Sequence, residues 1–480
     1  MATAMGILEG AGANIVSGSD VPVGGIAYRS DAVLPGDAFF CISGFSHDGH
    51  DFAADAVSRG ASVVICERRL DLDVAQFVVP DTRVALALAA SAFHDHPSED
   101  IAVVGVTGTN GKTTTTYLVE SIMRAAGMRT GIIGTVETRI DDERRESGRT
   151  TPESADLHAL FAEMRDSGIG GCAMEVSSHA IDLHRVDGVR FAAVAFTNLT
   201  QDHLDFHHTI EEYYSVKKRL FDEFDARSHV VNVDDPFGIG IASEHSGALT
   251  VGRVQGARIR AIDEVPDAMG TDFELMVDGD STHVRLPLSG SFNVSNALVA
   301  AGCARGMGIE LEAIRRGLEG TRQVPGRLER VECGQPFSVI VDYAHTPDSL
   351  AKAIDAVRVV TEGRVIVVFG CGGDRDPDKR PMMGRVAGES ADYSIITSDN
   401  PRTEDPVGII LQVEDGLVES GGGYEVVVDR QAAIVRAVEM AQPSDAVLIA
   451  GKGHEDYQIF ADRTVHFDDR EVARGVLGTC

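Results

Sequence analysis

Short apolar runs separated by polar, glycine-rich loops recur along the whole chain. The run IAVVGV (101–106) is rich in β-branched residues, and a glycine-containing turn and an amphipathic segment ending near Gly127 follow it. This order predicts a strand, a loop and a helix. Further runs of strand length are TGIIGT, GCAMEV and AAVAFTN, then VIVVFG, YSIIT and AVLIAG. Strands that alternate with helical segments predict an α/β fold with parallel sheets.

The same pattern divides the chain into three expected domains, since 480 residues are too many for one core. Residues 1–98 alternate short strands (PGDAFFCISG, ASVVICE) with a helix (DFAADAVSRG). The polar break HDHPSED precedes a central domain, residues 99–326, and Pro325-Gly326 marks its end. Residues 327–480 form the third, Rossmann-like α/β domain.

Two segments of the central domain depart from the parallel pattern. FELMV and THVRLPL alternate apolar and polar residues around Asp278-Gly279, which predicts an antiparallel hairpin and a side sheet. The charge-rich stretch 141–149 is expected to be a solvated loop or a hairpin tip.

Composition narrows the class of partner. A formal net charge of −31 argues against nucleic acid or an anionic membrane, because both require a basic surface. No apolar run approaches membrane-spanning length, and the N-terminus lacks the basic start of a signal peptide. Seven scattered cysteines without a CxxC pair fit free thiols in a reducing cytosol. A cytoplasmic protein acting on small molecules is expected.

The loop GTNGKTTTT (108–116) is the strongest candidate for chemistry. Its backbone N–H groups and the following helix N-terminus form a cradle for anions. Lys112 can reach the β- and γ-phosphates of a nucleotide, and Thr113 can hold Mg²⁺. The loop is a variant, because Val106 stands where the usual pattern has glycine.

Open parallel sheets bind ligands at the carboxyl ends of their strands, so the loop after each strand is informative. Glu175 lies near the end of the run GCAMEV and is a candidate Mg²⁺ ligand. His203 follows AAVAFTN and is a candidate for a second cation or for phosphate. Lys217 lies on a predicted helix; a surface lysine is its simpler interpretation, and the pattern does not distinguish it from Lys218.

Three loops of the third domain combine glycine with charges of both signs. They are 370–381, 398–406 and 451–458, and we expect all three at the same edge of one sheet. Arginine grips carboxylates with two N–H groups while acidic residues accept from ammonium groups, so a zwitterionic ligand would suit them. For any single loop, casual surface ion pairs remain the alternative.

Ten motifs in order resemble those of the Mur ligase family, from about residue 24 to the C-terminus. They are GTNGKTTT, TTPES, EVSSHAIDLHR, TNLTQDHLDFH, GSFNVSN, VPGRLE, VDYAHTPDSL, GCGGDRD, SDNPRTE and GKGHEDYQ. The resemblance implies a UDP-substrate-binding, an ATP-binding and an amino-acid-binding domain. It further implies ATP-dependent peptide-bond formation through an acyl-phosphate, in peptidoglycan precursor synthesis. The acceptor acid would be the D-glutamate γ-carboxyl of UDP-N-acetylmuramoyl-L-alanyl-D-glutamate.

The resemblance also assigns residues. The ATP positions are Gly108, Thr109, Asn110, Gly111, Lys112, Thr113, Thr114, Asn293, Asn296, Arg327 and Asp342. Lys112, Glu175, His203 and Lys217 are the implied catalytic residues. Thr113 and Glu175 would hold one Mg²⁺, and His203 would belong to a second site. Lys217 would be a carbamate, formed with carbon dioxide, that helps to hold the second Mg²⁺.

Two substrate sets follow by the same resemblance. The UDP-substrate set is Ser30, Thr150, Thr151, Ser177 and Arg185. The set for meso-diaminopimelate is Arg375, Asp399, Asn400, Pro401, Arg402, Gly451 and Glu455. Arg402 would grip the distal carboxylate and Glu455 would suit the ammonium. The charges of Arg29-Ser30-Asp31 are exchanged relative to the usual pattern, and Leu183 stands where some relatives have Gln.

Several alternatives remain. One is the same ligase using L-lysine, and another is a sister ligase such as a folylpolyglutamate synthetase. A phosphate-loop kinase or GTPase and a catalytically idle nucleotide-binding scaffold belong to other classes. A monomer is the family expectation.

Overall fold

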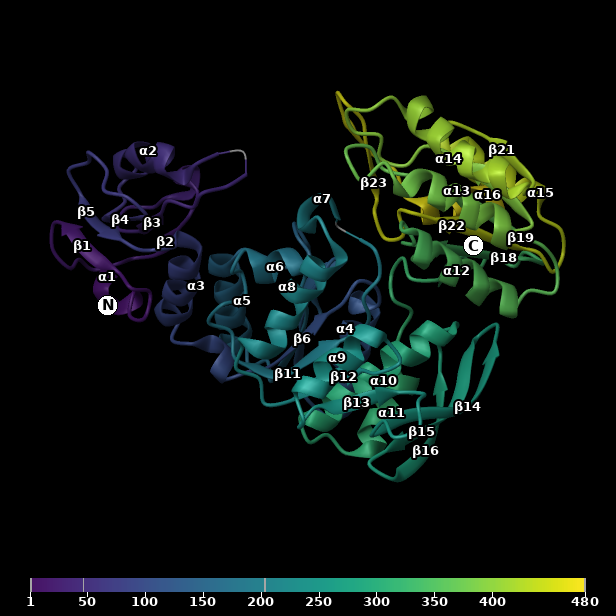
Figure 1. Ribbon diagram of the computed structural model, residues 1–480, viewed down its shortest axis with the longest axis horizontal. Coiled ribbons are helices and arrows are strands. Elements are labelled where there is room, and N and C mark those ends of the chain that lie inside the picture. Colours follow the sequence, from purple (N-terminus) through teal and green to yellow (C-terminus); the bar gives the residue numbers. More distant parts are fainter. Residues whose placement is uncertain (1, 46, 203, 479–480) are drawn as a thin grey trace. The chain divides into compact units, whose positions relative to one another are not determined.

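A computed structural model describes residues 2–45, 47–202 and 204–478 (Figure 1). The chain is α/β, as predicted, and divides into two compact units. Unit 1 comprises Met1–Thr107, Gly127–Ala195 and Ser215–His229, and unit 2 comprises Gly108–Ala126, Phe196–Tyr214 and Val230–Cys480.

Unit 1 begins with a five-stranded sheet in the order β1-β5-β4-β3-β2. Its strands are β1 (Asn14–Ser17), β2 (Ile26–Ala27), β3 (Ala38–Phe40), β4 (Val63–Cys66) and β5 (Ala75–Val78). The helices beside them are α1 (Ala4–Ile7), α2 (Ala53–Ser58) and α3 (Thr82–Phe93). All pairs are parallel except β1 with β5, and the predicted strands PGDAFFCISG and ASVVICE are confirmed.

A second group of strands in unit 1 lies in the order β11-β6-β10-β7-β8-β9. The strands are β6 (Ala102–Thr107), β7 (Thr130–Ile133), β8 (Glu137–Ile140), β9 (Glu143–Glu146), β10 (Gly171–Glu175) and β11 (Phe191–Phe196). The helices are α5 (Ser154–Asp166) and α6 (Ser178–Asp182). β10 is parallel to both β6 and β7, and β8 and β9 form a hairpin around Asp141. The charge-rich stretch is therefore a hairpin tip, as predicted.

Unit 2 has strands in the order β16-β15-β14-β13-β12, which are part of an eleven-stranded sheet rather than a separate side sheet; the predicted antiparallel pairing is that of β14, β15 and β16. The strands are β12 (His229–Asn232), β13 (Leu249–Gly252), β14 (Ile259–Asp267), β15 (Gly270–Val277) and β16 (Asp280–Leu286). The helices are α4 (Lys112–Ala125), α7 (Leu204–His207), α9 (Pro236–Glu244), α10 (Ser291–Gly306) and α11 (Leu311–Glu319); α8 (Ile210–Asp222) runs from unit 2 into unit 1. Val277 pairs with Asp280 across Asp278 (φ 52°) and Gly279 (φ 103°), so the antiparallel hairpin is confirmed.

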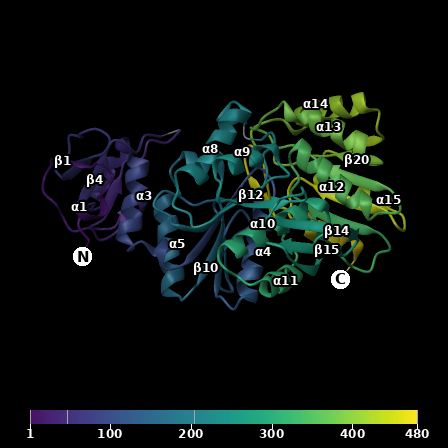
Figure 2. The same cartoon turned by 60° about the horizontal axis from the view of Figure 1, so that its bottom comes forward.

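The third sheet has the order β17-β18-β22-β19-β20-β21. Its strands are β17 (Glu329–Arg330), β18 (Ser338–Asp342), β19 (Val365–Phe369), β20 (Tyr393–Ile396), β21 (Tyr424–Val426) and β22 (Ala446–Ala450). The remaining elements are α12 (Pro347–Val359), α13 (Lys379–Ser390), α14 (Pro406–Ser420), α15 (Arg430–Met440), α16 (Asp469–Leu477), β23 (Tyr457–Ile459) and β24 (Thr464–His466). Figure 2 shows α13 and α14 side by side next to β20.

The positions of β22, β19 and β20 in this sheet decide where the functional loops lie. The three strands are consecutive neighbours and all parallel, and each is fully buried or nearly so. The loops 451–458, 370–381 and 398–406 therefore leave the same edge of the sheet, as predicted.

The expectation that the cysteines are free thiols is confirmed in part. Cys41, Cys66, Cys172, Cys303 and Cys371 are free and buried, whereas Cys333 is disulfide-bonded, so the expectation of free thiols is wrong for Cys333. No helix within the described ranges combines the length and apolarity needed to cross a bilayer.

Candidate functional site

The phosphate loop joins β6 to α4, as the sequence predicts. Gly111 precedes the helix with φ 87°, a left-handed conformation that favours glycine. The Lys112 ammonium donates to the carbonyl oxygens of Gly108 and Thr109 at 2.9 and 2.8 Å. Thr113 and Thr114 lie buried in the first turn of the helix. The Lys112 side chain therefore lies along the loop, and its ammonium contacts the loop carbonyl oxygens.

Residues 197–200 hold this loop in place. The N–H of Thr109 donates to the carbonyl oxygen of Asn198 at 2.8 Å, and that of Asn110 donates to Asn198 Oδ1 at 3.0 Å. The Thr197 hydroxyl donates to the Asn110 carbonyl oxygen at 2.7 Å. A Cβ on Gly108 would lie 2.0 Å from Thr197 Oγ1, so the approach requires glycine.

Helix α10 packs two buried asparagines against the same loop. Asn296 Nδ2 donates to Asn293 Oδ1 at 3.1 Å, which fixes both amides. A Cβ on Gly111 would lie 2.2 Å from Asn296 Oδ1. The structure therefore brings the predicted Asn293 and Asn296 to the phosphate loop, across more than 180 residues of sequence.

Arg327 and Asp342 complete the predicted nucleotide set. Arg327 Nη2 donates to Thr113 Oγ1 at 3.0 Å, and the guanidinium lies 4.5 Å from the centre of the Tyr343 ring. The buried Asp342 carboxylate accepts from the N–H groups of Leu328 and Ala344 at 2.7 and 2.8 Å. Burial raises the pKa of Asp342. Tyr343 was not predicted, although it belongs to the motif that carries Asp342.

Unit 1 gathers four of the five predicted UDP-substrate residues around the end of β10. The Thr151 hydroxyl donates to the Glu175 carbonyl oxygen at 2.8 Å and accepts from the Ser177 N–H at 3.2 Å. Arg185 Nη1 donates to the Thr151 carbonyl oxygen at 3.3 Å. Thr150 is linked through Thr135, whose N–H and hydroxyl donate to the Glu175 carboxylate at 2.8 and 3.0 Å.

Glu153 is a member of this cluster that sequence reasoning missed. Its carboxylate is nearly buried and faces Arg185 at 2.9 Å, Arg83 at 3.6 Å and the guanidinium of Arg149. Burial lowers the pKa of Arg185, and Glu153 opposes that effect. Glu153 lies in the motif TTPES, so the motif pointed to this residue, but the sequence did not indicate that it binds arginines.

Ser30, the fifth predicted residue, lies in the 3-10 turn Ser30–Ala32. Hydrogen bonding by Ser30, and then by Arg59, holds the pKa of Asp55 below its ordinary value. The exchanged charges beside it, Arg29 and Asp31, form an exposed ion pair at 2.7 Å.

The structure separates the two lysines that the pattern could not tell apart. Lys217 on α8 is 1% exposed, so the surface interpretation is wrong for it. Lys218 is partly exposed and pairs with Asp222 at 2.7 Å. His203 lies outside the described residues. Within those ranges no group of three or more His, Cys, Asp or Glu side chains is arranged to hold a metal ion.

At the edge of the third sheet, the three predicted loops are joined by hydrogen bonds. Asn400 Nδ2 donates to Glu455 Oε2 at 2.9 Å, and Arg402 Nη1 donates to the Gly373 carbonyl oxygen at 2.8 Å. Arg402 has a left-handed backbone, with φ 53°. Arg375 Nη1 donates to the carbonyl oxygen of its neighbour, Asp374.

Close backbone packing also joins these loops. A Cβ on Gly451 would lie 2.7 Å from Asp399 Oδ2, and one on Gly373 would lie 2.0 Å from the Pro401 carbonyl oxygen. Lys452 and Arg430, which sequence reasoning missed, are fully buried behind Glu455 and Asp399. A buried charged residue does not follow the apolar periodicity of a strand or helix, so the sequence pattern did not identify these two residues.

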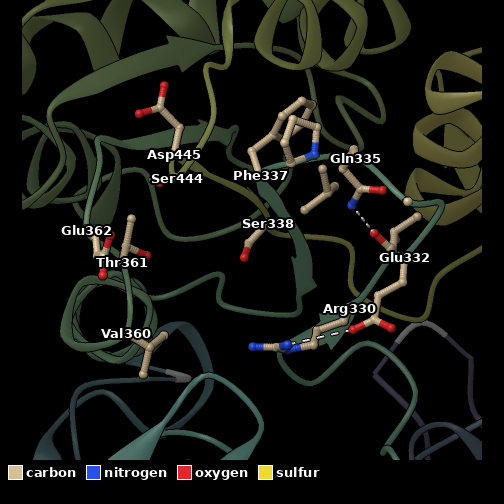
Figure 3. Close-up of a pocket in the computed structure, with 14 residues that line it drawn as sticks. Arg330, Glu332, Gln335, Phe337, Ser338, Val360, Thr361, Glu362, Ser444 and Asp445 are labelled. Atoms are coloured by element: carbon tan, nitrogen blue, oxygen red, sulfur yellow. Dashed lines mark hydrogen bonds and ion pairs between the residues drawn. The ribbon is translucent and has the colours of Figure 1, made fainter.

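A cavity of about 600 Å³ lies at the opposite edge of the same sheet (Figure 3). Its lining includes Ser338 at the start of β18, Asp445 before β22 and Glu362 before β19. Figure 3 shows Arg330 and Glu332 facing each other there, at 3.7 Å. None of the predicted site residues is among the residues that line this cavity.

Comparison with known proteins adds the following. Three family models match: "Mur ligase family, catalytic domain" over residues 22–105, "Mur ligase middle domain" over 106–304, and "Mur ligase, glutamate ligase domain" over 326–453. A Geobacillus kaustophilus protein is 46% identical over 93% of each chain, and a Bacillus licheniformis protein is 44% identical over 95% of each. Both are named UDP-N-acetylmuramoyl-L-alanyl-D-glutamate--2,6-diaminopimelate ligase. A solved structure of a ligase with that name covers 95% of each chain with 31% identity and a TM-score of 0.69.

The close contact between Gly111 and Asn296 predicts that a side chain at position 111 lowers the free energy of unfolding. Gly127 has nearly the same φ, 86°, but a Cβ there would meet nothing within 4 Å. Gly127→Ala should lower the free energy of unfolding by about 1–2 kcal/mol, the cost of the left-handed backbone alone. Gly111→Ala should lower it by roughly 1–3 kcal/mol more, because Asn296 is buried and fixed by Asn293. Urea unfolding of both variants measures the difference, and equal losses would contradict it.

Proposed function

The chain belongs to the Mur ligase family, and on that premise we propose that it is an ATP-dependent acid–amino-acid ligase. It joins meso-diaminopimelate to the D-glutamate γ-carboxyl of UDP-N-acetylmuramoyl-L-alanyl-D-glutamate, in peptidoglycan precursor synthesis. The observation that carries this is the similarity to ligases of that name over nearly the full length of both chains. The fold is the three-domain Mur ligase fold, and we assign the domains to residues 1–98, 99–326 and 327–480. We expect the enzyme to act as a cytoplasmic monomer.

The reaction requires activation, because a carboxylate is a poor electrophile. A γ-carboxylate oxygen attacks the γ-phosphorus of ATP, the bond to the β-phosphate oxygen breaks, and ADP leaves. The amino group of diaminopimelate then attacks the acyl carbon of the acyl-phosphate. The tetrahedral intermediate loses inorganic phosphate, and the nitrogen loses a proton to give the amide.

Two anions must approach each other in the first step, so catalysis depends on positioning and on positive charge. The amide of Gly111 and the N–H groups at the start of α4 bind phosphate oxygens, and Lys112 brings an ammonium to them. Arg327 lies on Thr113 and brings a second cation to the start of the helix. Asn293 and Asn296 fix the loop from the other side.

By family resemblance, we assign one Mg²⁺ to Thr113 and Glu175, whose hydroxyl and carboxylate oxygens are of the kind that Mg²⁺ prefers. Thr135 orients the Glu175 carboxylate with two hydrogen bonds. Bound there, the metal would neutralise phosphate charge. By family resemblance, we assign His203 and Lys217 to a second metal site.

We assign the UDP-substrate to Ser30, Thr150, Thr151, Ser177 and Arg185. Glu153 holds Arg185 at 2.9 Å, so the guanidinium reaches the cluster in a fixed orientation. The carboxylates and diphosphate of this substrate are suitable partners for the arginines around Glu153.

We assign the amino acid to the edge loops of the third domain, at Arg375, Asp399, Asn400, Pro401, Arg402, Gly451 and Glu455. Arg402 pairs with the distal carboxylate of diaminopimelate, and Glu455 accepts from its ammonium. L-Lysine lacks the distal carboxylate. Binding it would leave the arginine unpaired, which disfavours the lysine-adding alternative.

The assay that tests the function measures inorganic phosphate and ADP. Release should require ATP, Mg²⁺, the UDP-muramoyl dipeptide and the amino acid together, with a peptide product in equal amount. A folylpolyglutamate synthetase would not use the UDP-linked acid. A kinase or GTPase would show no requirement for the amino acid, and an idle scaffold would release no phosphate. Any of these outcomes would reject the proposal.

Arg402→Ala should remove discrimination against L-lysine. We expect kcat/KM for diaminopimelate to fall by about 10²- to 10³-fold, the loss for a charged pair to substrate, with kcat/KM for L-lysine nearly unchanged. Arg463→Ala, which removes an exposed arginine of the same domain, is the matched control. If L-lysine is the better substrate of the unaltered protein, the assignment fails.

Lys217→Ala should abolish turnover, and added bicarbonate should not restore it, if Lys217 acts as a carbamate. The amine nitrogen attacks carbon dioxide, two protons leave, and a cation becomes an anion suited to Mg²⁺. The complete burial of this side chain supports the assignment. The neighbouring Lys218→Ala is the control. Near-normal turnover of Lys217→Ala, or no ¹³C carbamate resonance from labelled bicarbonate in the unaltered enzyme, would reject the carbamate.

A further inference from the structure

Lys452 is the buried cation of the amino-acid-binding edge. It lies in the loop between β22 and β23, and its side chain is fully buried. Its ammonium donates to Glu455 Oε2 at 3.1 Å and to Asn400 Oδ1 at 3.2 Å. It also lies 5.3 Å from the centre of the Tyr457 ring. A buried ammonium is costly unless every proton has an acceptor, so this lysine has a fixed place.

The contacts of Lys452 form part of a larger charged cluster. Arg430 is buried between Asp469, at 2.7 Å, and Asp399, at 3.9 Å. Asp399 accepts the N–H of Asn400 at 2.6 Å. The cluster thus contains three carboxylates and only two cations, Arg430 and Lys452.

We propose that Lys452 is a positioning residue for the amino-acid substrate. It keeps Glu455 ionised and turns the Asn400 amide so that Nδ2 faces Glu455, and the carboxylate is then ready to accept the ammonium of the incoming amino acid. This rests on the proposed function and adds to it a residue that acts on the substrate through Glu455.

The charges around Glu455 decide its protonation. Burial raises the pKa of Glu455, and Asp399 adds to the rise, whereas Lys452 and Asn400 oppose it. The neighbouring ionisable groups include Arg430, whose pKa is raised by Asp469 against the effect of burial. They also include the phenols Tyr343 and Tyr457, and burial raises the pKa of both phenols. Those phenols therefore stay neutral near pH 7. Lys452 is the cation in hydrogen-bond contact with the carboxylate, and removing it would raise the pKa of Glu455 further.

Lys452→Met tests the proposal, since methionine keeps the length of the side chain without its charge. The acid limb of kcat/KM for diaminopimelate should move upward by at least about one pH unit, because an opposite charge at this distance shifts a carboxyl by 1–3 units. Near pH 7 the KM for the amino acid should rise by about tenfold, with kcat and the KM for ATP nearly unchanged. Lys452→Arg should restore the acid limb. Arg463→Met removes an exposed cation of the same region and should leave the profile unchanged.

A double-mutant cycle keeps the proposal falsifiable if Lys452→Met folds poorly. Glu455→Gln removes the carboxylate on which Lys452 is proposed to act. In that background Lys452→Met should change the KM for the amino acid by less than about twofold, because the target of its charge is gone. The proposal would be overturned if Lys452→Met raised the KM for the amino acid by the full tenfold in the Glu455→Gln background. It would also be overturned if Lys452→Met left the acid limb of the kcat/KM profile unmoved.

The wild-type assay separates the two hypotheses. If the unaltered protein releases no phosphate with all four components, the proposed function fails. If it is active but Lys452→Met raises the KM for ATP as much as that for the amino acid, only the role of Lys452 fails.

Discussion

The proposed nucleotide-binding loop depends on hydrogen bonds, through main chain and side chains, between residues 109–110 and residues 197–200. Those bonds fix a loop of only four residues between a strand and a helix. Asn296 then closes on Gly111 at a distance that leaves no space for a side chain. Because the loop is held from outside, its remaining N–H groups are oriented before any phosphate binds, which is the preorganisation that charge stabilisation requires.

Sequence reasoning performed well where the information is local. Apolar runs of five or six residues predicted the buried strands, and Asp278-Gly279 predicted a two-residue turn, because its backbone favours positive φ. The shared edge of the loops after β19, β20 and β22 followed from parallel pairing alone. The pattern of apolar residues could not predict how strands and helices are grouped into two compact units, because this depends on contacts between distant segments.

The site residues that could be predicted from the sequence are those that match a family motif with an assigned role. Family resemblance supplied Asn293, Asn296, Arg327 and Asp342. The structure places Asn296 against Gly111, with Asn293 bonded to it, and Arg327 against Thr113, whereas Asp342 accepts from Leu328 and Ala344. Residues that act on other residues were missed: Glu153 holds an arginine, and Arg430 and Lys452 compensate buried carboxylates. Lys217 and Lys218 show the same limit, since the orientation of adjacent helical residues toward core or solvent depends on what the helix packs against.

The left-handed backbone of Arg402, together with its bond to the Gly373 carbonyl oxygen, has an evolutionary consequence. The residue that we propose selects the amino acid is held by a neighbouring loop as well as by its own. Replacing Arg402 would leave the Gly373 carbonyl oxygen without this donor, so that oxygen would need another partner. A change of amino-acid preference in this lineage therefore has to pass through compensating substitutions in both loops, so such changes should be rare and the intermediates epistatic.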